Sequence, residues 1–513
     1  MKNYIEKHLE DAFKQLGENV GPLMLEQPKD PSMGDYALTN AFIMAKRLKK
    51  APHLLAKDWV DKLNQLEIVK TYFKLSVVGP YLNIHLKDKL LVELFSRYKE
   101  PYIQKKKQGK SMLLEFVSAN PTGPLHVGHA RWAVIGDMYA RVSKHFLKEV
   151  SCEFYINDAG VQIENLKKSI DAKRNGEAIP EGGYQGNYID DLVKQDKDPV
   201  LAILELQKRS LDRLRVHFDT WFSEKKLHQE NRILEVVKQL KEKGALYENE
   251  EALWFRSSDY GDSKDRVLKK SDGQWTYFAV DVAYHADKVA RGYDRLLNIW
   301  GADHHGYVTR IKSALTALLP DNKENNLQVE LGQMVSLLKG GLPLKMSKRA
   351  GNMLFLDELL DEIGVDATRV FLAQQSVGTH SKIDLEEAKK TSMDNPVYTM
   401  QYAHARFCRV LERFSCSTCK LQQELHPVER ELILHMLRFE AVLEDVFDQF
   451  SLHLLIEYAL KLAKTMHRFY ELCPIQSEIL KIRSHRVYIV NRASLFLRFV
   501  LEELCGIKAP ASM

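Results

Sequence analysis

The sequence predicts an α/β protein: a doubly wound parallel (Rossmann-like) sheet, preceded by an α+β unit and followed by an all-α helical bundle. Three observations support this architecture. From about residue 111, short apolar runs alternate with helical patterns, which is typical of parallel α/β sheets. The first hundred residues instead place two strand-like runs among helical stretches. Beyond about residue 390, long amphipathic helical patterns dominate.

The length and composition agree with this division. The 513 residues suggest about three domains, and the 45% hydrophobic and 28% charged content is ordinary for a globular protein. Disordered, collagen-like and disulfide-stapled classes are excluded. No apolar run approaches the ~18–20 residues of a membrane span, and the charged start lacks a signal-peptide core. With six cysteines, we expect a cytoplasmic protein.

The N-terminal unit is predicted to span residues 1–105. Apolar alternation at 72–77 and 81–86, split by a Gly-Pro pair, predicts a β-hairpin. Helical patterns cover the first residues and 37–65. The basic stretch 99–110 contains proline and glycine and predicts a linker.

The central domain is predicted to span 106–385 and the helical bundle 386–513. Expected helices begin at His126 and after Asn157-Asp158. Turn-rich and highly charged sequence predicts an insertion near 170–250. The strands of the central sheet are expected at 113–117, 152–156, 276–280, 296–300 and 327–331.

Charge is unevenly distributed in the C-terminal helices. Residues 421–460 hold eight acidic and two basic side chains, whereas 461–498 hold eight basic and two acidic ones. The basic stretch is able to neutralise phosphates, although most charge runs are solvated helix faces. Cys416 and Cys419 form a single CxxC with no second pair, so we expect no zinc site.

The segment His126-Val127-Gly128-His129 follows a strand and a Pro/Gly loop and opens a helix. Two imidazoles at i and i+3 share a helix face, and free N–H groups at a helix N-terminus attract phosphate. Gly128 leaves room for a flat ligand near the backbone. Two ordinary surface histidines are the alternative.

A second basic motif lies at Lys345-Met346-Ser347-Lys348, between flanking glycines. Two ammonium groups at this spacing suit a polyphosphate on which negative charge develops. Alone, such a loop is equally typical of a solvated surface.

Together, HVGH and KMSKR match the double signature of class I aminoacyl-tRNA synthetases, and the chain resembles the arginyl-tRNA synthetase family. The resemblance covers nearly the whole chain. It rests on these segments in order: GDYALTNAF (34–42), GPYLNI (79–84), EFVSANPTGPLHVGHAR (115–131), YINDAGVQI (155–163), TYFAVDVAYH (276–285), GQMV (332–335), GVDATRVFL (364–372) and the C-terminal VLEELCGIKAPASM.

The residues themselves point to a cationic substrate. Glu115 lies inside an apolar strand, and a buried carboxylate is costly unless it is paired. A substrate guanidinium would pair with it, but a structural salt bridge to a protein cation explains it equally well. Tyr277 and Asp281 are four residues apart and share one face. The resemblance implies that Glu115, Tyr277 and Asp281 hold the arginine side chain and that Asn120 holds its α-amino or carboxylate end.

The resemblance assigns ATP to a second set of positions. His126, Gly128, His129, Lys345 and Lys348 would bind its phosphates, and the histidines and lysines are the predicted catalytic residues. Gly301 and Asp303 would lie near the ribose. His305 would lie near the amino acid, although some family members have glutamine there. Met334 and Val335 would flank adenine, with plain core packing as the alternative.

The resemblance also identifies a tRNA-binding face. Tyr398, Tyr402, Arg406 and Arg409 interleave aromatic and basic groups, which suits unpaired RNA bases. An aromatic stripe at helical spacing is otherwise more typical of core. At Thr368 the family's usual leucine is replaced.

The implied reaction is two-step charging of tRNA(Arg): L-arginine and ATP give arginyl-adenylate, and the ester passes to the 2′-hydroxyl of the terminal adenosine. Mg²⁺ would accompany ATP. We expect a monomer without a membrane partner, an editing domain or a metal site of its own. The alternatives are a dinucleotide-forming nucleotidyltransferase, which needs no helical bundle, and a catalytically inactive RNA-binding relative. Within the class, cysteinyl- and lysyl-specific enzymes are the rivals.

Overall fold

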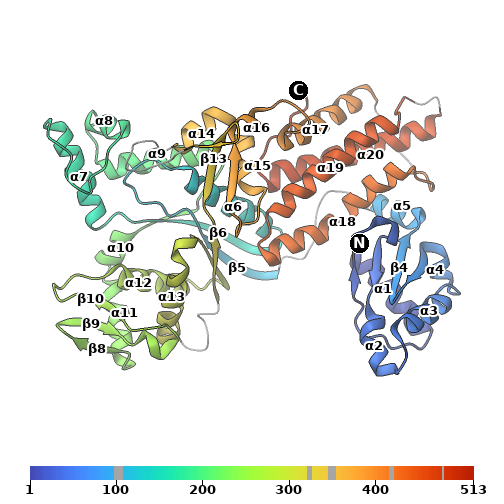
Figure 1. Ribbon diagram of the computed structural model, residues 1–513, viewed down its shortest axis with the longest axis horizontal. Coiled ribbons are helices and arrows are strands. Elements are labelled where there is room, and N and C mark those ends of the chain that lie inside the picture. The colour runs from blue at the N-terminus through green and yellow to red at the C-terminus, as the bar shows by residue number, and fades with distance from the viewer. Residues whose placement is uncertain (98–107, 320–325, 345–353, 415–420, 477–478) are drawn as a thin grey trace.

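A computed structural model describes residues 1–97, 108–319, 326–344, 354–414, 421–476 and 479–513. In Figure 1 a small N-terminal unit lies beside a row of long C-terminal helices, and the central sheet with its surrounding helices lies on the other side of that row. The described chain therefore has the three parts that the sequence predicts.

The N-terminal unit is a four-stranded antiparallel sheet in the order β1-β2-β4-β3. The predicted hairpin is confirmed, with Gly79 at φ +59° in its turn. Phe73 and Leu75 alternate into the core, as a half-buried strand requires. The elements are α1 (Lys2–Gln15), β1 (Leu25–Glu26), β2 (Tyr36–Leu38), α2 (Asn40–Leu48), α3 (Pro52–Leu63), α4 (Glu67–Tyr72), β3 (Phe73–Val78), β4 (Tyr81–Leu86) and α5 (Asp88–Arg97).

The central sheet has five parallel strands in the order β12-β11-β5-β6-β7. Its order reverses between β5 and β11, so ligands are expected outside the carboxyl ends of these strands. Leu114 and Leu297 are fully buried, since helices cover both faces of the sheet. The strands are β5 (Gln108–Glu115), β6 (Leu147–Ile156), β7 (Thr220–Ser223), β11 (Arg295–Gly301) and β12 (Leu327–Gly332).

One predicted strand is wrong: residues 276–280 begin the helix α12 (Tyr277–Ala290). The Thr276 hydroxyl accepts a hydrogen bond from the Ala279 amide at 3.3 Å and caps this helix. The apolar run is buried as a helix face in a second core cluster. A short apolar run does not distinguish a buried helix from a strand by periodicity alone.

The predicted insertion is interrupted by the short strand β7, which the sequence did not indicate and which pairs with β6. A second excursion after β7 contains a three-stranded sheet in the order β10-β9-β8. The elements between β6 and β11 are α7 (Val161–Arg174), α8 (Asn187–Val193), α9 (Pro199–Arg213), α10 (Glu224–Gln229), α11 (Arg232–Glu242), β8 (Leu246–Asn249), β9 (Ala252–Phe255), β10 (Arg266–Lys269) and α12.

Helix α6 (Val127–Ser143) packs on β5 and β6, and α13 (His305–Leu318) follows β11. After β12, a small sheet joins β13 to β14 and β15. The remaining elements are β13 (Val335–Lys339), β14 (Leu342–Pro343), α14 (Leu356–Ile363), α15 (Val365–Ala373), β15 (Ser381–Asp384), α16 (Leu385–Lys389), α17 (Pro396–Arg413), α18 (Pro427–Gln449), α19 (His453–Leu472) and α20 (Leu480–Phe499).

Part of the charge imbalance between the C-terminal helices is neutralised by ion pairs between those helices. Arg486 Nε lies 2.8 Å from Glu429, and Arg468 Nη1 lies 2.9 Å from Glu431. Two of the basic side chains of α19 and α20 therefore pair with acids of α18.

The N-terminal unit docks on α18, as Figure 1 shows. Asp35 is buried and forms an ion pair with Arg430, whose guanidinium also donates to the Leu86 carbonyl at 2.9 Å. Arg438, two turns further along α18, donates to the Asp35 carbonyl at 2.7 Å. Two arginines of one helix thus converge on a single residue of the N-terminal unit.

Candidate active site and tRNA-binding face

The N-terminus of α6 lies at the carboxyl edge of the central sheet. His126 is the N-cap residue, and its Nδ1 accepts a hydrogen bond from the Gly128 amide at 3.1 Å. The imidazoles of His126 and His129 stack with ring centroids 3.7 Å apart. The sequence motif therefore forms a compact pair of imidazoles over a helix N-terminus, where the partial positive charge favours anions.

Gly128 has a steric role at this helix end. A Cβ atom at this position would lie 2.9 Å from His126 Cε1. Because Gly128 has no side chain, the His126 ring is able to lie over the first turn of α6. This steric role is separate from the predicted one, in which Gly128 leaves room for a ligand near the backbone.

Glu115 ends β5 and is buried, but its partner is internal. Lys288 of α12 is completely buried, and its Nζ lies 2.7 Å from Glu115 Oε2. Ser118 Oγ donates to Oε1 at 2.9 Å. Burial raises the pKa of Glu115, but the charge of Lys288, the neighbouring His285 and the hydrogen bonds from Lys288 and Ser118 together bring the pKa below its ordinary value. Of the two interpretations of this buried carboxylate, the structure shows the structural salt bridge to a protein cation.

A hydrogen-bonded chain extends from this pair along α12. Lys288 also donates to Asn298 Oδ1 at 2.6 Å, and Asn298 Nδ2 lies 2.9 Å from His285 Nε2. The other nitrogen of His285 is 2.8 Å from the Asp281 carbonyl. Burial lowers the pKa of His285 to about 4, so the ring is neutral at pH 7. It connects Asn298 to the Asp281 carbonyl through hydrogen bonds and adds no charge to the site.

Asp281 differs from Glu115 in having a hydroxyl as its hydrogen-bond partner. Tyr307 donates to Asp281 Oδ2 at 2.7 Å. Burial raises the pKa of Asp281 to about 7, and the charges of Glu115 and Glu224 act in the same direction. Tyr277, one turn earlier on α12, is 56% exposed. Asp281 therefore lies in a negative environment that a cation would relieve.

A third carboxylate, Glu224 at the start of α10, was not identified from the sequence. It is buried and accepts a hydrogen bond from the Tyr155 hydroxyl at 2.7 Å. His228 Nε2 lies 3.9 Å from its other oxygen. Burial raises the pKa of Glu224 as well. Its only sequence signal is an acid directly after the short strand-like run TWFS, within the predicted insertion.

Polar side chains border these carboxylates. The amide of Asn120, the predicted contact for the α-amino or carboxylate end of arginine, donates to Gln162 Oε1. Asp158 accepts from Ser223 Oγ at 2.6 Å and from the Lys225 amide at 3.1 Å. Asp158 therefore connects the loop after β6 to the start of α10.

The predicted ATP positions follow the ends of β11 and β12. Gly301 pairs with Gly332 in the register of these strands. Asp303, His305 and Met334 are exposed, and Met334 is 58% accessible. Val335 is buried, so its side chain belongs to the core, as the alternative interpretation held. Lys345 and Lys348 lie outside the described residues.

The predicted tRNA-binding residues form a stacked ladder on α17. The Tyr398 and Tyr402 rings are 5.5 Å apart, and Arg406 lies 4.8 Å above the Tyr402 ring. The ladder continues onto α19, where Tyr402 stacks on His467 at 5.6 Å and Arg406 lies 4.5 Å from the Tyr470 ring. The α19 members were not foreseen.

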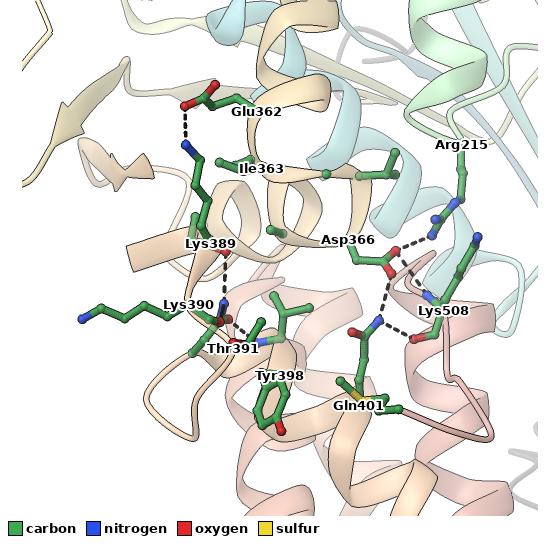
Figure 2. Close-up of a pocket in the computed structure, with 17 residues that line it drawn as sticks. Arg215, Glu362, Ile363, Asp366, Lys389, Lys390, Thr391, Tyr398, Gln401 and Lys508 are labelled. Atoms are coloured by element: carbon green, nitrogen blue, oxygen red, sulfur yellow. Dashed lines mark hydrogen bonds and ion pairs between the residues drawn. The ribbon is translucent and has the colours of Figure 1, made fainter. Parts of the chain in front are cut away.

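Arg409 is placed differently from the ladder. Its Nη2 donates to the Met513 carbonyl at 2.8 Å, so it holds the C-terminal end of the chain. Tyr398 also lines a cavity of about 570 Å³ between α15, α16 and α17. Figure 2 shows Asp366 in this cavity, bonded to Arg215 and Gln401.

Some features concern the whole described chain. No described helix combines the length and apolar character that a membrane span requires. Within the same residues, no cluster of three or more His, Cys, Asp or Glu is arranged to hold a metal ion. Cys152, Cys408, Cys473 and Cys505 are free thiols, and the CxxC lies outside the described ranges.

Family models match three successive parts of the chain: the arginyl tRNA synthetase N terminal domain (residues 1–86), the catalytic domain of class I (R) tRNA synthetases (187–394) and the DALR anticodon binding domain (400–513). An arginine–tRNA ligase of Staphylococcus aureus is 36% identical, over 97% of this chain and 96% of its own length.

Solved structures agree with this match at the level of the fold. The Thermus thermophilus arginyl-tRNA synthetase superposes with a TM-score of 0.82 at 21% identity, covering 100% of both chains. The Plasmodium falciparum enzyme gives 0.75 at 17% identity, covering 100% of this chain and 99% of its own. With three family models in the right order, a relative of similar length, and paired histidines beside buried carboxylates, the chain belongs to the arginyl-tRNA synthetase family.

Proposed function

We propose that this protein is an arginine–tRNA ligase. It joins L-arginine to ATP as arginyl-adenylate, releases diphosphate and transfers the arginyl group to the 2′-hydroxyl of the terminal adenosine of tRNA(Arg). Family membership supports the reaction, and the carboxylates of Asp281 and Glu224 support the amino acid.

The observation that carries the amino-acid assignment is the pair Asp281 and Glu224. Each is hydrogen bonded to a tyrosine hydroxyl, and the charge of Glu224 contributes to the raised pKa of Asp281. A guanidinium offers five donors in a planar fork and would satisfy both carboxylates. Citrulline would leave them unpaired, and such a site discriminates strongly against analogues that lack the required donors.

The remaining contacts with arginine are assigned from where the predicted side chains lie. Tyr277 projects from the first turn of α12 and would cover the guanidinium, while Asn120 would hold the α-amino or carboxylate end. Glu115 would contribute through its fixed negative charge, which Lys288 keeps ionised. His305 is exposed beside Tyr307 in sequence, and we assign it a place at the edge of the arginine site.

Catalysis would come from positioning and charge stabilisation rather than from a covalent intermediate. The α-carboxylate of arginine attacks the α-phosphorus of ATP, and diphosphate leaves. His126, His129, Lys345, Lys348 and the amides of α6 would hold the phosphates. Gly128, Gly301, Asp303 and Met334 would border the nucleotide.

Mg²⁺ would enter with ATP. The α6 N-terminus offers imidazole and amide nitrogens, whereas Mg²⁺ prefers oxygen ligands. The ion is therefore assigned to the phosphates of the substrate, where it would neutralise charge on the leaving diphosphate.

For tRNA, we assign the ladder of Tyr398, Tyr402 and Arg406 to unpaired bases, with Arg409 holding the chain end beside it. We keep the division into an additional tRNA-binding domain (1–105), a catalytic domain (106–385) and an anticodon-binding domain (386–513). A cytoplasmic monomer fits an enzyme of protein synthesis with free thiols.

The test is an aminoacylation assay with total tRNA and each of the twenty amino acids. We expect ATP-dependent ester formation with arginine alone. Esterification of another amino acid, or none of any kind by folded protein, would overturn the proposal.

A further inference from the structure

Arg131 connects the histidine-capped helix to a distant part of the chain. It lies on α6, two residues after His129, and is fully buried. Its Nη1 donates to the Gln333 carbonyl at 2.7 Å and to the Thr379 carbonyl at 2.9 Å. Its Nη2 donates to the Ser376 carbonyl at 2.9 Å. One guanidinium therefore joins α6 to the turn after β12 and to the loop after α15.

These two segments are also bonded to each other. The Gln333 amide donates to the Val377 carbonyl at 3.0 Å, and the Ser381 amide donates to the Met334 carbonyl at 3.1 Å. The turn that presents Met334 is thus a rigid unit, and Arg131 is its polar attachment to α6. The planar fork of arginine reaches acceptors in several directions, which a lysine ammonium on a single stem does not reproduce.

The same junction is tightly packed on its apolar side. Trp132, the next residue of α6, is buried against Gly332 at the end of β12. A Cβ atom at Gly332 would lie 2.0 Å from the Trp132 ring. The spacing between α6 and this turn is therefore set by close contact as well as by hydrogen bonds.

We propose that Arg131 is a positioning residue for ATP: it holds the Gly332–Met334 edge at a fixed distance from His126 and His129. The inference rests on the proposed function, in which the histidines bind phosphates and Met334 borders the base. The carboxylates assigned to arginine lie on β5, α10 and α12, so the arginine site does not depend on this attachment.

The test compares Arg131→Lys with Arg369→Lys in the full-length enzyme. Arg369 is an equally buried arginine that donates to the Cys505 carbonyl at 2.7 Å and the Leu214 carbonyl at 2.9 Å and pairs with Asp137, away from the ATP site. For Arg131→Lys we expect the KM for ATP to rise about tenfold, with the KM for arginine unchanged. For Arg369→Lys we expect a lower melting temperature and an unchanged KM for ATP.

A second variant covers the case in which Arg131→Lys does not fold. Gly332→Ala pushes the same turn away from Trp132 and should also raise the KM for ATP. In the double variant Gly332→Ala/Trp132→Leu the clash is relieved, so the KM for ATP should return to the wild-type value. Unchanged KM values for ATP in both variants, or the same increase in Arg369→Lys, would overturn the proposal. Arginine charging by the wild-type enzyme, measured alongside, separates this failure from a failure of the proposed function.

Discussion

At the scale of single residues, the three carboxylates of the site differ in their partners. Glu115 has the Lys288 ammonium at 2.7 Å, whereas Asp281 and Glu224 have tyrosine hydroxyls. A neutral donor compensates a buried charge less completely than a cation does. The burial of Glu115 is therefore structural, and Asp281 and Glu224 carry the unsatisfied negative potential.

Arginine binding should depend on the protonation of Asp281. Since its pKa is raised to about 7 in the free protein, the carboxyl is mostly protonated at pH 6 and ionised at pH 8. A guanidinium pairs with the ionised form, so we expect the KM for arginine to fall as pH rises from 6 to 8. Steady-state kinetics at saturating ATP measure this. A KM that is flat over this range in wild type, or still sloped in Asp281→Asn, would contradict the assignment.

The same pKa predicts a stability cost. A carboxyl whose pKa rises from 3.8 to about 7 on folding stabilises the protein below about pH 4 and loses that contribution as pH rises through 7. Asp281→Asn should therefore raise the melting temperature of the ligand-free protein at pH 8. Calorimetry checks this, and the difference from wild type should shrink at pH 5.

Substitutions in the buried Glu115–Lys288 pair should lower the free energy of unfolding, and not only change the kinetics of the enzyme. Removing one partner of a buried pair leaves an uncompensated charge, so Lys288→Met should lower the unfolding free energy by about 3–5 kcal/mol. Glu115→Gln combined with Lys288→Met should cost less than the sum of the single changes, as measured by denaturant unfolding. Additive effects would show that the two groups do not interact.

At the scale of elements, the ends and faces of helices matter most. The N-terminus of α6 presents the stacked histidines, and one face of α12 carries Tyr277, Asp281 and Lys288. The ladder on α17 continues onto α19. The sequence predicts these helices in full or in part, but it predicts a strand where α12 begins. A short apolar run is compatible with a helix and with a strand. Packing between the sheet and α11 favours the helix.

The ladder on α17 predicts a selective effect on tRNA. Arg406→Ala removes the guanidinium between the Tyr402 and Tyr470 rings, and losing one stacking platform of about 1–3 kcal/mol should raise the KM for tRNA roughly tenfold. The KM values for ATP and arginine should not change. Arg413→Ala, on the same helix but at its exposed C-terminal end, is the matched control and should leave the tRNA KM near wild type.

At the scale of the whole molecule, α18 joins the N-terminal unit to the helical bundle. The junction concentrates on Asp35, which receives Arg430 at its carboxylate and Arg438 at its carbonyl. Such a buried ion pair contributes more to fixing an orientation than an exposed one, which is worth about 0–1 kcal/mol.

This junction predicts that Asp35→Ala weakens tRNA charging without touching the active site. Loss of the carboxylate that pairs with Arg430 should loosen the N-terminal unit, speed its proteolytic release and raise the KM for tRNA several-fold, while the KM for arginine is unchanged. Lys62→Ala, which removes an exposed pair with Glu18 inside the same unit, is the control. Equal proteolysis of both variants would argue against the junction.

The amino-acid sequence by itself determined the order of the three parts, most strands of the central sheet and the two signature motifs, because periodicity and local spacing are properties of neighbouring residues. It also placed Asp281 and Tyr277 on one segment. Only the tertiary structure decided that Glu115 is neutralised by Lys288, 173 positions away, that Glu224 joins Asp281, and that Val335 is core. Partners of buried charges come from elements that are distant along the chain, so their pairing is set by packing and by the cost of leaving a buried charge unpaired.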